Sequence, residues 1–329
     1  MTSLPAYAEL HCISNFSFLR GASHAEELVA RAVQLGYTAL AITDECSFAG
    51  SVRAHLAARG TALHLIHGTE LRLACGMKLV LLAQNRAGYG NLSVLVTLAR
   101  RRAEKGRYRL TRKDLAGWDG GGVPDCLALW IPSIVGAGDT ATWDVDARWL
   151  AEHFAGRTWI AFERHLRPDD HERLARLREL AAATHLPLVA TGDVHMHARS
   201  RRPLQDVLAA LRLNTTVAAA GAALFANGER HLRQRCALAR LYPPELLAET
   251  VKIAARCAFS FDELRYEYPD EVVPAGETPD SWLRRLTEEG LLKRYPAGVP
   301  DKVLAQVEHE LRLIAEMAYA CLLYTSRCV

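Results

Sequence analysis

Short apolar stretches that alternate with amphipathic helical stretches constrain this fold more than any other feature of the sequence. The apolar stretches predict strands at 7–13, 38–43, 63–70, 78–83, 159–163 and 186–191. The intervening stretches predict helices at 23–35, 51–59, 90–102 and 170–184. Alternation of this kind is typical of a parallel sheet, either open or closed into a barrel. The sequence therefore predicts an α/β fold.

Polar side chains collect where these strands end. The residues at the ends are His11, Asp44, Glu70, His165, Asp193 and His195. Asp193 and His195 lie two apart, so on an extended segment they point to the same side and supply half of a metal site. For this pair alone, a strand end capped by water is an equal alternative. Six such residues at equivalent positions favour one shared polar site, because the carboxyl ends of strands carry the site in both architectures.

Composition excludes several classes of protein. The chain has 329 residues, half of them hydrophobic, and a net charge of only +3, so nothing global indicates a polyanion partner. None of the eight cysteines forms a Cys-x-x-Cys pair, which argues against a structural zinc knuckle. We expect reduced thiols in a cytoplasmic protein. No apolar run is long enough to span a bilayer, so we expect no membrane association.

The remaining segments give weaker signals. Residues 117–146 are rich in glycine but lack a phosphate-binding pattern, so we interpret them as surface loops. Helices are predicted at 203–213, 243–257, 280–295 and 301–317, and the prolines of 263–279 favour a linker. These features predict one domain over 1–262, a linker over 263–279 and a further segment over 280–320.

Two basic clusters could contact phosphates. The first lies within 100–113, where a solvated helix end is an equally good interpretation. The second comprises Arg199, Arg201 and Arg202, directly after the strand that ends at the predicted site. We favour contact of this second cluster with an acidic ligand, such as the backbone of a nucleic acid.

Three stretches resemble a known family: His11–His24, Ala41–His55 and Gly192–Asp206. They are similar to the PHP (polymerase and histidinol phosphatase) domain at the front of bacterial C-family DNA polymerases, and most of all to the error-prone branch. The resemblance covers residues 5 to 320. It implies a distorted, TIM-like β/α barrel, followed by a small mostly helical segment. It also implies divalent metal ions, zinc or manganese, at the strand ends.

The resemblance assigns roles to individual residues. The implied metal ligands are His11, Glu70, His165, Asp193 and His195, and Asp44 and Glu45 are expected around them. Several positions depart from the family pattern. Ile13, Arg20, Glu45 and Lys78 stand where histidines or a carboxylate are expected. An apolar side chain cannot ligate, and added cations oppose a divalent metal. We therefore predict a degenerate site that binds one metal weakly or none, with Arg20 or Lys78 paired to the leftover carboxylates.

The resemblance also implies a function for the parent protein. This would be DNA-directed DNA synthesis in DNA repair and damage-induced mutagenesis, with magnesium as cofactor. Its partners would be DNA, a sliding clamp and mutagenesis-accessory proteins. Residues 280–320 would begin the polymerase palm, 321–329 would be an unrelated tail, and no catalytic residue is expected within this fragment. The alternatives are a stand-alone, metal-dependent phosphoesterase of the PHP type and an α/β domain that binds only a partner protein.

Overall fold

The computed structural model describes residues 4–119, 121–132, 140–264, 273–317 and 319–320. The chain divides into two compact units, residues 1–264 and 265–329. Among the described residues, no helix is both long enough and apolar enough to cross a membrane. Residues 265–272 of the predicted linker and all of the predicted tail at 321–329 lie outside the described residues.

The first unit is built on a seven-stranded sheet whose strands follow one another in chain order. They are β1 (Ala8–Glu9), β2 (Ala39–Ile42), β3 (His64–Arg72), β4 (Lys78–Ala83), β5 (Cys126–Ile131), β6 (Thr158–Glu163) and β7 (Leu188–Thr191). The segments that follow β1 and β7 pair in parallel, because Ile13 donates its backbone N–H to Val194 and Val194 donates to His11. The sheet is therefore nearly closed into a barrel.

The sheet is mixed, which corrects the prediction of a parallel sheet. Strand β4 runs antiparallel to both β3 and β5, whereas all other neighbours are parallel. The link at 73–77 between β3 and β4 is too short for a crossover helix, which a parallel connection would need. As a result Lys78, the first residue of β4, lies opposite Arg72, the last residue of β3. Lys78, at the amino-terminal end of β4, therefore lies at the edge of the sheet where the parallel strands have their carboxyl ends.

Strand β5 corrects the prediction of surface loops over 117–146. All of Cys126–Ile131 is buried, and the helix α5 (Thr140–His153) follows. The flanking glycines dominated the sequence pattern, and a six-residue apolar run cannot be assigned from periodicity alone. Residues 120 and 133–139 of this segment lie outside the described residues.

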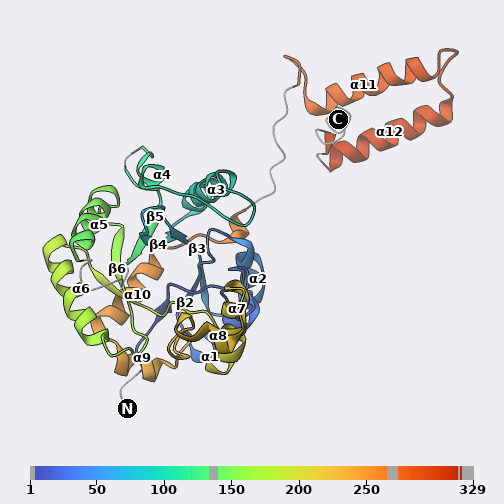
Figure 1. Cartoon of the computed structure of the whole chain (residues 1–329). Helices are drawn as coiled ribbons and strands as arrows, with labels where there is room; N and C mark the ends of the chain where they lie inside the picture. Colours follow the sequence, from blue (N-terminus) through green and yellow to red (C-terminus); the bar gives the residue numbers. More distant parts are fainter. Residues whose placement is uncertain (1–3, 120, 133–139, 265–272, 318, 321–329) are drawn as a thin grey trace. The chain divides into compact units, whose positions relative to one another are not determined.

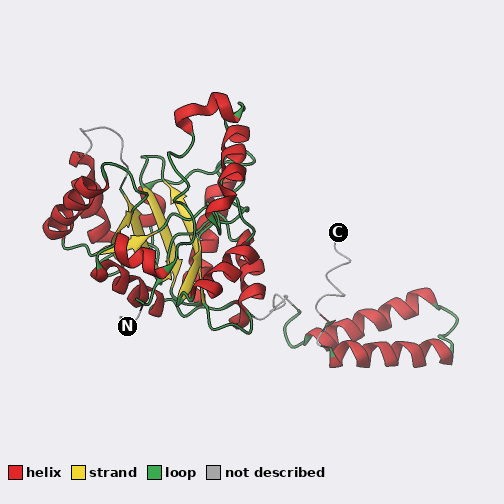
Figure 2. Ribbon diagram, turned by 90° about the horizontal axis from the view of Figure 1, so that it is seen from below, coloured by secondary structure: helices red, strands yellow, loops and turns green. Residues whose placement is uncertain are grey.

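Helices surround the sheet (Figures 1 and 2). They are α1 (Ala25–Leu35), α2 (Ala49–Ala58), α3 (Arg86–Arg101), α4 (Arg112–Ala116), α5, α6 (Asp170–Thr184), α7 (Arg202–Arg212), α8 (Val217–Ala220), α9 (Arg235–Leu241) and α10 (Pro244–Ala255). Side chains alternate across the strands. Leu40 and Ile42 enter the larger core cluster, whereas Ala39 and Ala41 enter a smaller one together with Ile253 of α10. Burial of both faces fixes the register of the strands, and with it the positions of the strand ends.

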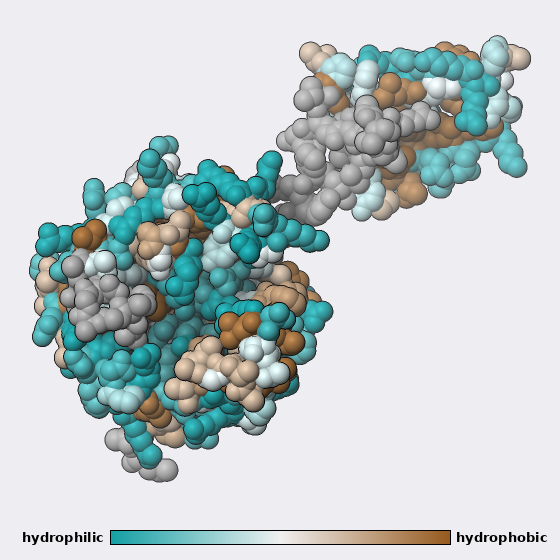
Figure 3. Space-filling view, viewed as in Figure 1, coloured by the Kyte–Doolittle hydropathy of each residue, from teal (hydrophilic) through white to brown (hydrophobic). Residues whose placement is uncertain are grey.

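The second unit is a helical hairpin of α11 (Pro279–Arg294) and α12 (Asp301–Glu316), in accord with the helices predicted there. Arg284 of α11 makes two hydrogen bonds to Glu308 of α12, at 2.5 and 3.0 Å. Neither helix contains a buried residue, and Leu292 is 70% exposed. Figure 3 shows apolar side chains among the hydrophilic ones on the visible face of this unit.

Candidate functional site

The strand ends gather one buried polar cluster at the mouth of the barrel. His11, which follows β1, lies at its centre. The His11 Nε2 atom is 2.8 Å from Glu70 Oε2 on β3, and Nδ1 is 3.0 Å from Glu163 Oε1 at the end of β6. Nε2 is also 3.5 Å from Asp193 Oδ1, just beyond β7. One imidazole thus links residues from three other parts of the barrel.

The two remaining predicted ligands border the same cluster. The His195 Nε2 atom is 3.3 Å from Asp193 Oδ1. The His165 Nε2 atom is 3.9 Å from Glu163 Oε2 and 4.0 Å from Asp193 Oδ2. The structure therefore brings together all five residues that the sequence singled out as metal ligands. Whether they hold a metal stays a prediction.

Sequence reasoning missed two carboxylates. Glu163 is the last residue of β6 and is buried like Glu70, and a carboxylate at the end of a predicted strand was the signal that could have found it. Glu9, on β1, is buried and accepts backbone hydrogen bonds from His11 and Gly192 and a hydroxyl hydrogen bond from Tyr7. Glu9 therefore ties β1 to the segment after β7.

Fixed cations reach into the cluster. Arg20 Nη1 lies 2.6 Å from Glu70 Oε1 and 2.5 Å from Glu45 Oε2. Lys78 Nζ lies 3.1 Å from Glu70 Oε2 and 3.4 Å from Asp193 Oδ1. Both cations thus pair with carboxylates of the site, as the sequence predicted. Lys78 reaches these oxygens because β4 is antiparallel to its neighbours.

A third cation, Arg230, was not expected from the sequence. Its Nη1 contacts Asp193 Oδ2, and its guanidinium lies 4.1 Å above the centre of the Phe225 ring. The backbone carbonyl of Arg230 accepts hydrogen bonds from the N–H groups of His195 and Met196. This pairing holds the segment against the strand end, although no local pattern around residue 230 indicates it.

Two carboxylates of the cluster, Glu70 and Glu163, are ionised at neutral pH. Burial alone would raise the pKa of Glu70, but the charges of Lys78 and Arg20 outweigh burial and hold this pKa well below its usual range. The pKa of Glu163 is likewise lowered, because Lys78 and a hydrogen bond from His11 outweigh burial.

The other two histidines are neutral at the same pH. Burial lowers the pKa of His165 to about 4, and the nearby charge of Arg230 adds to the effect. Burial, helped by Arg20 and Lys78, holds the pKa of His195 well below its usual value. Both nitrogens of His165 and Nδ1 of His195 are buried without a hydrogen-bond partner among the described residues. These imidazoles keep the capacity to bind a ligand.

Asp44 organises the loop that carries Arg20. Its Oδ1 accepts hydrogen bonds from the N–H of Ser14 (2.8 Å) and from the N–H and hydroxyl of Ser17 (3.1 and 2.8 Å), and its Oδ2 accepts one from the Ser14 hydroxyl (2.7 Å). Its neighbour Glu45 holds the Arg20 guanidinium. Both residues thus support the cluster from outside.

The donor atoms for a metal are present, but cationic side chains already pair with some of them. One atom each of His11, Glu163 and Asp193 lies within 4.8 Å of the others, which is close enough to hold one ion. In this arrangement, however, Lys78 and Arg230 engage the Asp193 oxygens. A zinc or manganese ion would have to displace these cations.

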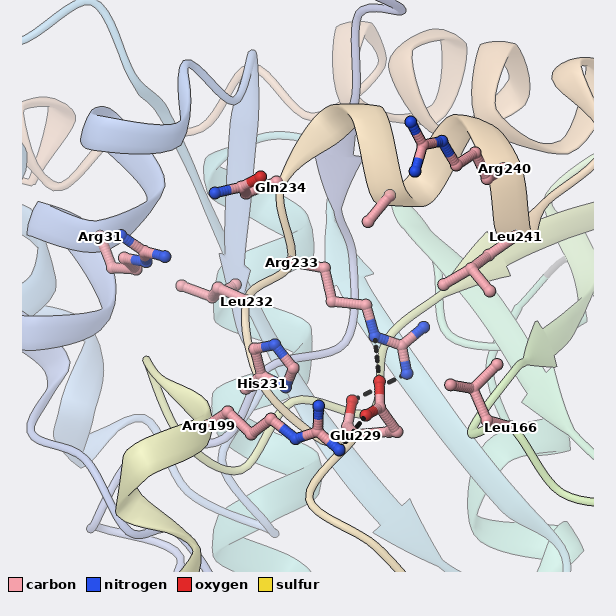
Figure 4. Close-up of a pocket in the computed structure, with 11 residues that line it drawn as sticks. Arg31, Leu166, Arg199, Glu229, His231, Leu232, Arg233, Gln234, Arg240 and Leu241 are labelled. Carbon is pink, nitrogen blue, oxygen red and sulfur yellow. Dashed lines mark hydrogen bonds and ion pairs between the residues drawn. The ribbon is translucent and has the colours of Figure 1, made fainter.

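The three arginines predicted to contact nucleic acid have partners within the protein. Arg199 lies 3.2 Å from Glu229, Arg201 contacts Glu27, and Arg202 lies 2.7 Å from Asp206. Figure 4 shows Glu229 between Arg199 and Arg233, in a surface pocket of about 440 Å³ between the segment after residue 228, α1 and α9. Contact of these arginines with nucleic acid stays a prediction.

The chain is similar in sequence to known proteins. Residues 9–164 match the family model of the PHP domain. In solved structures, an amidohydrolase from Chromobacterium violaceum is similar over 58% of this chain and 88% of its own, with 17% identity and a TM-score of 0.45. PsfC from Pseudomonas syringae PB-5123 is similar over 58% and 75%, with 12% identity and a TM-score of 0.35.

Curated relatives are more specific. The chain is 64% identical over 318 residues to the error-prone DNA polymerase of Dechloromonas aromatica (strain RCB), which is 96% of this chain and 30% of that protein. It is 57% identical over 341 residues to the error-prone DNA polymerase of Azoarcus sp. (strain BH72), with shares of 96% and 32%. The chain is therefore similar over almost all of its length to error-prone DNA polymerases, part of it matches the PHP domain, and it spans about a third of the length of these relatives.

Proposed function

We propose that this chain is the PHP-domain portion of an error-prone DNA-directed DNA polymerase and that its PHP site is structural and not hydrolytic. One observation carries the proposal: Arg20, Lys78 and Arg230 engage the carboxylates that a metal would need. PHP-type hydrolysis depends on metal ions that generate hydroxide from bound water. Here the negative charge is already neutralised by side chains, so nothing drives a divalent ion into the site.

The same ion pairs give the site a structural role. Glu70 lies on β3, Lys78 on β4 and Asp193 beyond β7, and Arg230 comes from a distant segment. Breaking a buried pair of this kind costs about 3–5 kcal/mol. The cluster therefore fastens the mouth of the barrel, as a metal ion would do in a site that kept its ligands.

For the whole protein we propose DNA synthesis during DNA repair and damage-induced mutagenesis, including translesion synthesis, in the cytoplasm. Residues 280–320 would begin the palm, and the carboxylates that hold magnesium for nucleotidyl transfer would lie outside this chain. DNA, a sliding clamp and mutagenesis-accessory proteins would be its partners. The name of the relatives and the family resemblance support these proposals.

Hydrolysis and metal content test the structural role. The purified chain is assayed with bis-p-nitrophenyl phosphate and with a labelled primer, in Mn²⁺ or Zn²⁺, and its metal is measured after gel filtration. We expect turnover no higher than that of the Asp193→Ala variant and far less than one equivalent of bound metal. Robust hydrolysis that Asp193→Ala abolishes would contradict the proposal.

The second candidate function is that of a metal-dependent phosphoesterase. The mutual distance of the His11, Glu163 and Asp193 donor atoms favours it. If it is correct, Mn²⁺ will bind stoichiometrically, and Glu163→Gln will weaken that binding and lower the hydrolysis rate together.

DNA binding tests the remaining alternative, in which the chain is a domain that binds only a partner protein. We expect the chain to bind primed DNA with an affinity that falls as salt rises, because phosphate contacts release counterions. No binding at low salt would count against the polymerase assignment.

A further inference from the structure

A strongly basic cavity opens over the ion pairs of the barrel mouth. Its volume is about 260 Å³, and we call it the barrel-mouth pocket. Its walls include five cationic side chains but only two carboxylates, Glu45 and Asp193. The cationic residues are Arg20, Arg72, Lys78, Arg212 and Arg230. The floor of the pocket is the cluster in which a PHP metal would lie.

The cations of the pocket fall into two groups. The three inner ones, Arg20, Lys78 and Arg230, are ion-paired with carboxylates. The other two, Arg72 and Arg212, are exposed, and neither has a carboxylate within 4.0 Å among the residues that the structure describes. The outer part of the pocket therefore carries positive charge that the protein itself does not neutralise.

Buried polar groups without partners line the same pocket. Gln205, on α7, is 2% exposed, and its side-chain Oε1 has no hydrogen-bond partner among the described residues. His195 is equally buried, and its Nδ1 also lacks a partner there. A buried polar group without a partner is costly, so each points to a bound molecule. After rotation of the amide, Gln205 offers N–H donors to the pocket.

We propose that the barrel-mouth pocket binds a terminal phosphate group without a divalent metal ion, through Arg72, Arg212 and Gln205. This inference rests on the proposed function, in which side-chain cations stand in for the metal. Guanidinium groups pair with phosphate oxygens in two parallel hydrogen bonds. The pocket has room for about nine water molecules. That space takes a phosphate and its sugar, and a terminal phosphate carries more negative charge for the guanidinium groups than an internal phosphodiester does.

Phosphorylated oligonucleotides test the proposal. Four versions of one short fluorescent single strand are compared by anisotropy in EDTA: a 5′-phosphate, a 3′-phosphate, both ends as hydroxyls, and an internal-phosphate control that is longer by two nucleotides. We expect one of the two phosphorylated ends to bind at least about tenfold more tightly than the hydroxyl form. Inorganic phosphate should compete with it. Equal binding of all four strands would overturn the proposal.

Charge-matched variants locate the site. The double variant Arg72→Gln, Arg212→Gln should lose the preference for a terminal phosphate. The control Arg148→Gln, Arg178→Gln removes the same charge from α5 and α6 and should keep that preference. All these arginines are exposed, so circular dichroism should show unchanged folding. An equal loss in both double variants would mean non-specific attraction and would refute the site.

The two proposals fail in different ways. Binding of the terminal phosphate that requires Mn²⁺ would overturn both, because the metal would then be part of the site. The phosphate site alone would be refuted if the terminal phosphate binds neither in EDTA nor in Mn²⁺ while the metal content is low and no hydrolysis occurs. The structural role of the cluster would then remain supported.

Discussion

Replacing Lys78 with methionine tests whether an ammonium group fills the place of a metal ion. Lys78 is 12% exposed in its side chain, and its partners Glu70 and Asp193 are 2% and 4% exposed. Methionine keeps the length and the apolar stem of the side chain but removes the charge. Two buried carboxylates then face each other across a site with fewer cations.

The expected loss follows from the partners that remain. Removal of one member of a buried ion pair costs about 3–5 kcal/mol. Glu70 still has Arg20 at 2.6 Å and Asp193 still contacts Arg230, so the loss should be at the lower end of that range. We expect the free energy of unfolding to fall by about 3 kcal/mol at pH 7.5 in EDTA.

Metal rescue distinguishes a surrogate ion from an ordinary ion pair. The vacated carboxylates of the Lys78→Met variant should bind Mn²⁺. A concentration of 100 times the dissociation constant would then restore about 2.7 kcal/mol. The unmutated chain should gain far less, because Lys78 already holds these oxygens. Urea unfolding followed by circular dichroism and tryptophan fluorescence, with linear extrapolation, measures both effects.

A surface lysine provides the control. Lys252 pairs with Glu249 at 2.8 Å, but its side chain is 72% exposed. Lys252→Met should change the free energy of unfolding by less than about 1 kcal/mol. The reasoning is refuted if Lys78→Met costs no more than this control, or if Mn²⁺ stabilises the unmutated chain as much as the variant.

Two further predictions concern other buried groups. Asp44→Ala should lower the free energy of unfolding by about 3 kcal/mol, because the buried N–H groups of Ser14 and Ser17 lose their acceptor. Asp44→Asn should recover part of this loss, and chemical denaturation of both variants measures the two effects. Burial lowers the pKa of His67 to about 3, so below pH 6.5 the unfolded chain binds more protons than the folded chain. The free energy of unfolding therefore decreases as the pH is lowered, by about 2 kcal/mol from this residue at pH 5. The variant His67→Phe keeps a ring against Phe261 and should flatten the dependence of stability on pH between 6.5 and 5; an unchanged slope would contradict the assignment.

Much of the fold was predictable from local patterns. The helix at 170–184 agrees with α6, and the apolar stretch at 38–43 contains β2. Periodicity and strand-end polarity are properties of a short window of residues, so they are visible before folding. The direction of β4 was missed although the short link at 73–77 indicates it. The strand at 126–131 was missed because a six-residue apolar run between glycine-rich segments cannot be assigned from periodicity alone.

The sequence by itself determined which strands end in a carboxylate or an imidazole, since the length of each apolar run sets where a polar side chain follows it. Only the tertiary structure decided what neutralises those groups. Lys78 reaches Glu70 because β4 is antiparallel to its neighbours. Arg230 reaches Asp193 because a segment far along the chain pairs with the backbone after β7. Charge compensation in a buried site depends on distance in space, which no spacing along the chain encodes.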